Sequence, residues 1–141
     1  MGFKVNITGA ETINLDMETV TKVKYVTDTP NDSNARSKDV GATMIIEGKI
    51  MAGLDGVVFD GPKKMGTWSL VTAEQADSYR KVEVEVIAAG QVIRKITFPN
   101  AFVIDYTEHY GDTEGVGTFE LIVRQKKDKI ADITIEGGYG A

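Results

Sequence analysis

The sequence predicts an all-β fold, a mostly antiparallel β barrel or sandwich with one short α-helix. Apolar and polar residues alternate over short runs, which is typical of strands that bury one face. Glycines and polar turns separate these runs. With 141 residues, 42% of them hydrophobic, the chain is long enough for one domain over residues 1–141 and too short for two.

The N-terminal part contains three predicted strands. The first has an apolar face made of Phe3, Val5 and Ile7. The second extends from about Val20 to Thr27, with Val23 and Tyr25 on one face. The third extends from Val40 to Met51, and its apolar face contains Val40, Ala42, Met44 and Ile46. Since successive strand residues point to opposite sides, each of these strands can bury one face.

The clearest pattern is a β hairpin in RKVEVEVIAAGQVIRKITF, residues 80–98, with a tight turn at Ala89-Gly90. Pro99 and Asn100 are expected to end the returning strand, because proline cannot donate to a central ladder. The outgoing strand carries Val82, Val84 and Val86 on one face and Glu83 and Glu85 on the other. The returning strand groups Val92, Ile96 and Phe98.

A second antiparallel pair is predicted from AFVIDYTEHY, residues 101–110, and GTFELIVRQKK, residues 117–127. A last strand is expected in KIADITIEGG, residues 129–138. The total is about eight strands, which suits a sandwich or barrel.

One segment departs from this alternation. Thr72 is followed three residues later by Gln75, the capping-box arrangement that satisfies the free amides of a helix start. We therefore expect the helix from Thr72 to Tyr79, where it plugs an open end or packs on a flank of the β domain. The stretch LDGVVFDGPKKMG, residues 54–66, contains three glycines and Pro62 and is expected to be a loop.

Composition excludes several classes of protein. The formal net charge is −5 and the pI is about 4.9, which argues against specific nucleic-acid binding because such proteins need a clustered positive potential. There is no cysteine, so disulfides and thiolate chemistry are excluded. No apolar run approaches the roughly 18 residues of a membrane helix, so no membrane insertion is expected. We expect a cytoplasmic location.

His109 is the only histidine, and it lies among acidic residues. It could act as a base for Ser69 or Ser78, but it stands at a predicted strand end before a glycine turn. No nucleophile elbow, zinc-protease helix or phosphate loop is present. Asp32 and Asn34 lack the glycine and distal glutamate of a calcium loop. We therefore expect no enzyme, no cofactor, and no catalytic, cofactor-binding or metal-binding residues.

The order of elements from about Thr67 to Lys127 resembles the tail-tube superfamily, which includes phage tail tube proteins and the haemolysin-coregulated tube protein of type VI secretion. The resemblance rests on a helix, a hairpin with a glycine turn, the strand PNAFVIDY and the strand GTFELIV. It implies a structural subunit whose copies form a six-membered ring with sheets that join across subunits, and rings that stack into a tube. It also implies sheath or baseplate proteins as further partners, and a place within a phage-like tail particle as the alternative to a cytoplasmic location.

The polar stretch from Asp28 to Asp39 has no periodicity, and loops of this length usually have a role or are disordered. The resemblance implies that this stretch is an arm that lies across a neighbouring copy or the next ring. The charged residues proposed for this contact are Asp28, Asp32, Arg36, Lys38 and Asp39. Two other functions stay open. A small-ligand-binding β module would use an exposed aromatic cluster of Trp68, Tyr106 and Tyr110, and a hydrolase would use His109. Glu83 and Glu85 are expected to face a solvated surface or a channel.

Overall fold

The computed structural model describes residues 1–29, 40–51, 61–72, 74–112 and 116–137. It confirms a mostly antiparallel β fold, in which eight strands form an open sheet of order β2-β1-β5-β6-β7-β4-β3, with β8 paired to β6. The strands are β1 (Gly2–Thr8), β2 (Thr12–Leu15), β3 (Val20–Asp28), β4 (Gly41–Ile50), β5 (Arg80–Ala88), β6 (Gln91–His109), β7 (Gly117–Gln125) and β8 (Thr134–Glu136). The helices within these ranges are α2 (Gly61–Ser69) and the short 3-10 helices η1 (Ala76–Ser78) and η2 (Lys127–Asp132).

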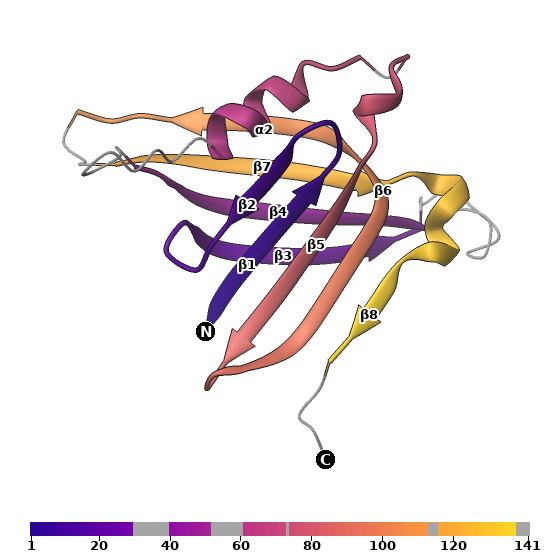
Figure 1. The fold of residues 1–141 in the computed structure, drawn as a ribbon, viewed down its shortest axis with the longest axis horizontal. Helices are drawn as coiled ribbons and strands as arrows, with labels where there is room; N and C mark the ends of the chain where they lie inside the picture. The colour runs from indigo at the N-terminus through magenta and orange to yellow at the C-terminus, as the bar shows by residue number, and fades with distance from the viewer. Residues whose placement is uncertain (30–39, 52–60, 73, 113–115, 138–141) are drawn as a thin grey trace.

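Strand β6 belongs to both halves of the sheet. Its residues 91–101 pair with β5, and its residues 101–109 pair with β7. In Figure 1, β1, β2, β5 and the start of β6 cross the direction of β3, β4, β7 and the end of β6. We call the second group the four-stranded layer. Apolar side chains between the two groups form one core, whose largest fully buried members include Trp68, Phe98, Ile7, Ile13, Met44 and Ile46.

The alternation in the sequence correctly predicts which strand faces are buried, except at Val92, which was grouped with Ile96 and Phe98 but is 43% exposed. The predicted core positions Val5, Ile7, Ala42, Met44, Ile46, Val82 and Val84 are all buried. Both predicted hairpins are present, as β5–β6 and β6–β7. At the first turn, Ala89 and Gly90 have φ of 51° and 75°, the left-handed conformation that a type I′ hairpin turn needs at both positions.

The predicted helix from Thr72 to Tyr79 is wrong, because residues 72–79 contain only η1 as a described helix. The α-helix is α2, in the segment that was expected to be a loop. Proline is favoured in the first turn of a helix, where no intrahelical N–H bond is lost, and Pro62 takes that place. The residues of α2 that face the core are Pro62, Met65 and Trp68. Between 72 and 79, by contrast, Glu74, Gln75 and Ala76 are exposed, so no apolar stripe holds a helix against the core.

The expected strand end at Pro99 is also wrong, since β6 continues to His109. Pro99 lies where the β5–β6 register shifts, between the pairs Val82↔Phe98 and Arg80↔Ala101, so the missing N–H is tolerated there. Two further differences concern short strands. β2 was not predicted. Residues 129–138 were expected to be one strand, whereas the described part of this segment contains a strand only at Thr134–Glu136, with η2 before it.

Candidate assembly interface

The four-stranded layer has two unpaired sides. Within the described residues, no strand pairs with the outer side of β3, and β6 beyond residue 101 pairs only with β7. Lys22 and Lys24 are exposed on β3, and Asp105 and Glu108 are exposed on β6. Unpaired strand edges carry free N–H and C=O groups that can pair with another chain, so both edges are candidate contact surfaces.

Cross-strand pairing places the charged edge residues at one level. Lys24 pairs with Ile45, Ile45 with Ile122, and Ile122 with Asp105. This row runs across the whole layer, with a cation at the β3 edge and an anion at the β6 edge. Neither Lys24 nor Asp105 has an ion-pair partner among the described residues, so both charges are available to a neighbouring molecule.

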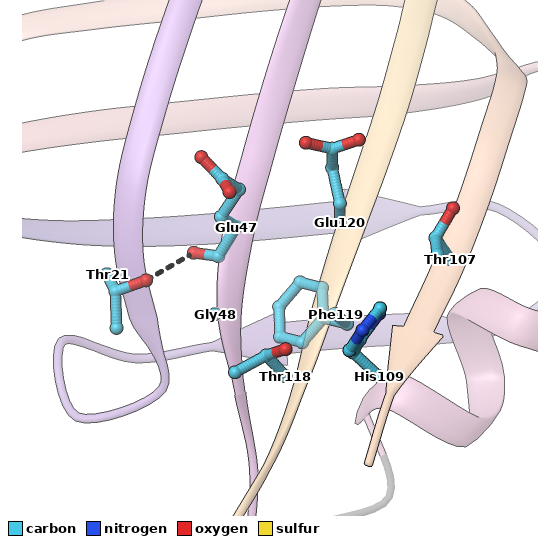
Figure 2. A pocket seen from close by; sticks show the side chains of 8 residues that line it. All are labelled: Thr21, Glu47, Gly48, Thr107, His109, Thr118, Phe119 and Glu120. Atoms are coloured by element: carbon cyan, nitrogen blue, oxygen red, sulfur yellow. Dashed lines mark hydrogen bonds between the residues drawn. The ribbon is translucent and has the colours of Figure 1, made fainter. Parts of the chain in front are cut away.

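A polar groove of about 370 Å³ crosses the exposed face of the four-stranded layer near the end of β6 (Figure 2). Glu47 and Glu120 are direct cross-strand neighbours there. Thr21 donates a hydrogen bond from Oγ1 to the carbonyl of Glu47 at 3.2 Å, and Lys22 lies 3.6 Å from the Glu47 carboxylate. The remaining lining residues are Gly48, Thr107, His109, Thr118 and Phe119.

His109 is exposed at the last position of β6, as its strand-end position in the sequence indicates. It has no hydrogen-bond or ion-pair partner in the described part of the chain. Ser69 and Ser78 lie beside Phe102, at the opposite end of this half of β6. His109 is seven positions beyond Phe102 on β6, a distance of roughly 20 Å along the strand. The geometry therefore gives no oriented nucleophile to His109, and a catalytic role has no support here.

The aromatic residues considered for a ligand-binding module do not form an exposed platform. Trp68 is buried and donates its Nε1–H to the carbonyl of Ser78 at 3.1 Å. Tyr106 is half-buried, with its hydroxyl 2.6 Å from Glu108 Oε2 and 3.0 Å from the Pro62 carbonyl. Tyr110 is exposed and donates to Glu108 Oε1 at 2.7 Å. Burial, followed by the hydrogen bond to Glu108, raises the pKa of Tyr106, and the hydrogen bond to Glu108 raises the pKa of Tyr110.

The sequence also led to predictions about a contact loop, metal sites and membrane-spanning segments. Asp28, from the proposed contact loop, is exposed at the end of β3, whereas Asp32, Arg36, Lys38 and Asp39 lie outside the described residues, as does Asn34. Within the described ranges, no group of three or more His, Cys, Asp and Glu side chains could hold a metal ion. None of the described helices has the length and apolar composition needed to cross a membrane.

The edge residues Lys24 and Asp105 were missed as functional candidates. A signal was available for the first of them, because Lys22 and Lys24 alternate with Val23 and Tyr25, and lysines on the open face are common on edge strands. For Asp105 no such signal existed. Its place at an edge follows from the change of partner along β6, which only the folded chain shows.

No protein-family model and no curated protein matches the chain, but solved structures do. A chain of the anti-feeding prophage baseplate, solved with six-fold symmetry, has a TM-score of 0.58 and 11% identity over 99% of this chain and 95% of its own. Hcp1 from Flavobacterium johnsoniae has a TM-score of 0.54 and 17% identity, covering 96% of both chains. The sheath-tube complex of an extracellular contractile injection system, PVC, has a TM-score of 0.53 and 13% identity over 96% of this chain and 88% of its own.

These similarities extend over nearly the full length of both chains. They show that this chain has the tail-tube fold, the architecture shared by Hcp1 and by chains of contractile injection systems.

Proposed function

We propose that the chain is a structural subunit whose copies form a closed ring, and that rings stack into the tube of a phage-tail-like or contractile injection apparatus. The observation that carries this proposal is the pair of edges of the four-stranded layer, one on β3 and one on β6, with which no other described strand pairs. The tail-tube fold supports it, because similar chains occur in a six-fold symmetrised baseplate and in a sheath-tube complex.

Strand direction is compatible with ring closure. The strands of the four-stranded layer alternate in direction, so β3 runs opposite to β6. Rotation about a ring axis leaves strand directions unchanged along that axis, so the β3 edge of one copy meets the β6 edge of the next in an antiparallel arrangement. Head-to-tail contacts of this kind close into a ring when the rotation returns to the start. Lys24 and Asp105 lie at the same level on the two edges, and their charges are complementary.

In the proposed ring, the four-stranded layers of all copies form one continuous wall, and one face of this wall is not covered by the subunit's other strands. The other face of each four-stranded layer is covered by β1 and β5 of the same subunit, since the shared core lies between them. The exposed face, with the polar groove, then lines the channel. In this arrangement Glu83 and Glu85, on the outward face of β5, lie on the outside of the ring and not in the channel.

Six copies per ring is the number that the six-fold symmetry of the similar baseplate supports. The further partners are sheath or baseplate proteins, and the location is a phage-like tail particle. The stretch from Asp28 to Asp39 remains a proposed contact between copies or between stacked rings. No catalytic step is part of this function.

The mass of the protein in solution, with negative-stain images of any large species, tests the proposal. The chain has no cysteine, so the double variant Lys24→Cys/Asp105→Cys can form disulfides only between introduced residues. Under oxidation it should give a ladder of covalent oligomers that ends at the ring size, whereas each single variant should stop at dimers. A protein that stays monomeric at high concentration would contradict the ring and favour a small-ligand-binding module that uses the polar groove.

A further inference from the structure

A small pocket of about 150 Å³ lies at the point of β6 beyond which β7 is its only described partner strand. Strand β5 ends its pairing with β6 at the pair Arg80↔Ala101, and the pocket opens beside the next two β6 residues. Its walls come from the end of α2, from the turn before β5, and from β6. We call this pocket the aromatic socket, and its main lining residues are Trp68, Val71, Ser78, Tyr79, Phe102 and Val103.

The walls of the aromatic socket are fixed by contacts within the subunit. The ring of Tyr79 meets Phe102 edge to face, with ring centroids 5.9 Å apart. Trp68 is held by its hydrogen bond to the Ser78 carbonyl, and the Arg80 guanidinium stacks 5.2 Å from its ring centroid. A site with such prepared walls loses little side-chain entropy when it takes up a ligand group.

Two features of the aromatic socket indicate an unfilled contact. The pocket is lined mainly by aromatic and aliphatic side chains, which favour an apolar group. Ser78 is 6% exposed, and its hydroxyl has no hydrogen-bond partner among the described residues. Buried hydroxyls are nearly always hydrogen-bonded, so an occupant that brings a backbone N–H or C=O group would satisfy it. An extended strand supplies both an apolar side chain and backbone polar groups.

We propose that the aromatic socket receives Val26, on β3 of the neighbouring copy, and thereby sets the register of the subunit contact. The inference rests on the proposed ring. Val26 pairs with Thr43, Thr43 with Arg124, and Arg124 with Phe102, so Val26 and Phe102 occupy one level at opposite edges of the layer. When the two edges meet level, Val26 reaches the start of the free β6 edge, and Lys24 reaches Asp105. A shift of the strand pairing would break both the apolar contact of Val26 and the charged contact of Lys24, so the two contacts together favour one register.

Filling the aromatic socket from within the subunit tests this assignment. Val71→Trp places a large side chain in the pocket and should raise the concentration needed for ring formation by at least about tenfold. Leu70→Trp is the matched control, because Leu70 is adjacent in sequence, 81% exposed and not part of the lining. It should assemble like the unchanged protein. Thermal unfolding of the dilute variants checks that both are folded.

The strand side provides a second test that leaves the socket intact. Val26→Asp should weaken ring formation to a similar extent, and Thr27→Asp, one position along on the opposite face of β3, should weaken it much less. The pair Val26→Cys/Val71→Cys should cross-link neighbouring copies under oxidation. If rings form normally in both Val71→Trp and Val26→Asp, the assignment of Val26 to the aromatic socket is wrong, but the proposal that the protein forms rings is supported. If the unchanged protein forms no ring, both proposals fail.

Discussion

Arg80 and Asp77 form a two-point ion pair at the start of β5. The guanidinium donates from Nη2 to Asp77 Oδ2 at 2.7 Å and from Nε to Oδ1 at 3.2 Å. The arginine side chain is only 3% exposed, and that of the aspartate is 31% exposed. Asp77 Oδ1 also accepts a hydrogen bond from the backbone N–H of Ala10 at 3.2 Å. This one carboxylate therefore links the turn after β1 to the turn before β5.

We predict that Asp77→Asn destabilises the subunit by about 2 kcal/mol, because it leaves a buried guanidinium without its counter-charge. The value is below that for a fully buried pair, since Asp77 is partly solvated. Chemical denaturation at neutral pH measures the difference. Lys81→Gln, which removes a charge from an exposed site on the same strand, should change stability by less than about 0.5 kcal/mol.

The same pair gives a prediction for acidic pH. The hydrogen bond from Arg80 lowers the pKa of Asp77 below its ordinary value of 3.8. A lowered pKa contributes stability that is present above the ordinary value and is lost as the pH falls towards the lowered one. The stability difference between the unchanged protein and Asp77→Asn should therefore hold from pH 7 to about pH 4 and shrink below it. A difference that grows on acidification would contradict the assignment.

Tyr106 gives the opposite dependence at high pH. Burial raises its pKa above the ordinary value of 10.0, so its contribution to stability is present below pH 10 and is lost as the pH rises further. Tyr106→Phe should cost about 1 kcal/mol at pH 7 through the lost hydrogen bonds. Above pH 10 the unchanged protein should lose stability faster than the variant, which urea titrations at pH 7 and 10.5 would show. Burial also raises the pKa of Tyr25. Because Tyr25 is present in both proteins, its contribution to the pH dependence cancels in the comparison.

The strands were predictable because strand burial has a period of two residues that survives in a single sequence. Ala42, Met44 and Ile46, or Val82 and Val84, can bury one face only if they form strands, and the structure buries all of them. The turn at Ala89-Gly90 was predictable because Gly90 adopts a left-handed conformation without steric cost and alternating runs stand on both sides of it.

The helix and the edges were not predictable in the same way. The capping-box pattern at Thr72 is a local signal. The exposed residues that follow it, Glu74, Gln75 and Ala76, give a helix no apolar face to pack against the core. Met65 and Trp68, three residues apart after Pro62, were the better helix signal, but neighbouring glycines concealed it. The edge role of Asp105 depends on the bend of β6 from β5 to β7, which is a property of the tertiary structure.

His109→Ala is expected to leave the protein unchanged. His109 is exposed and without a described partner, so the variant should differ in stability by less than about 0.5 kcal/mol and should form rings as before. Light scattering and thermal unfolding of the two proteins check this. A hydrolytic activity that disappears in His109→Ala, while fold and assembly remain, would show that the histidine is catalytic.

The strongest prediction concerns Lys24 and Asp105, which have no described ion-pair partner within the subunit and lie level on opposite edges of the four-stranded layer. Lys24→Glu and Asp105→Lys should each place like charges at the subunit contact and weaken every contact by about 1 kcal/mol, roughly fivefold in affinity. The double variant restores opposite charges in reversed positions, so it should recover most of the ring formation, as measured by light scattering over a dilution series.

Two controls separate this contact from a general charge effect. Lys81→Glu makes the same charge change as Lys24→Glu, but it lies exposed on β5, outside the four-stranded layer, and should assemble normally. The defects of both single variants should also diminish in high salt, because exposed charges are screened beyond roughly 3 Å at 1 M. Failure of the double variant to recover, with each single variant folded and defective, would mean that Lys24 and Asp105 do not meet across the subunit contact.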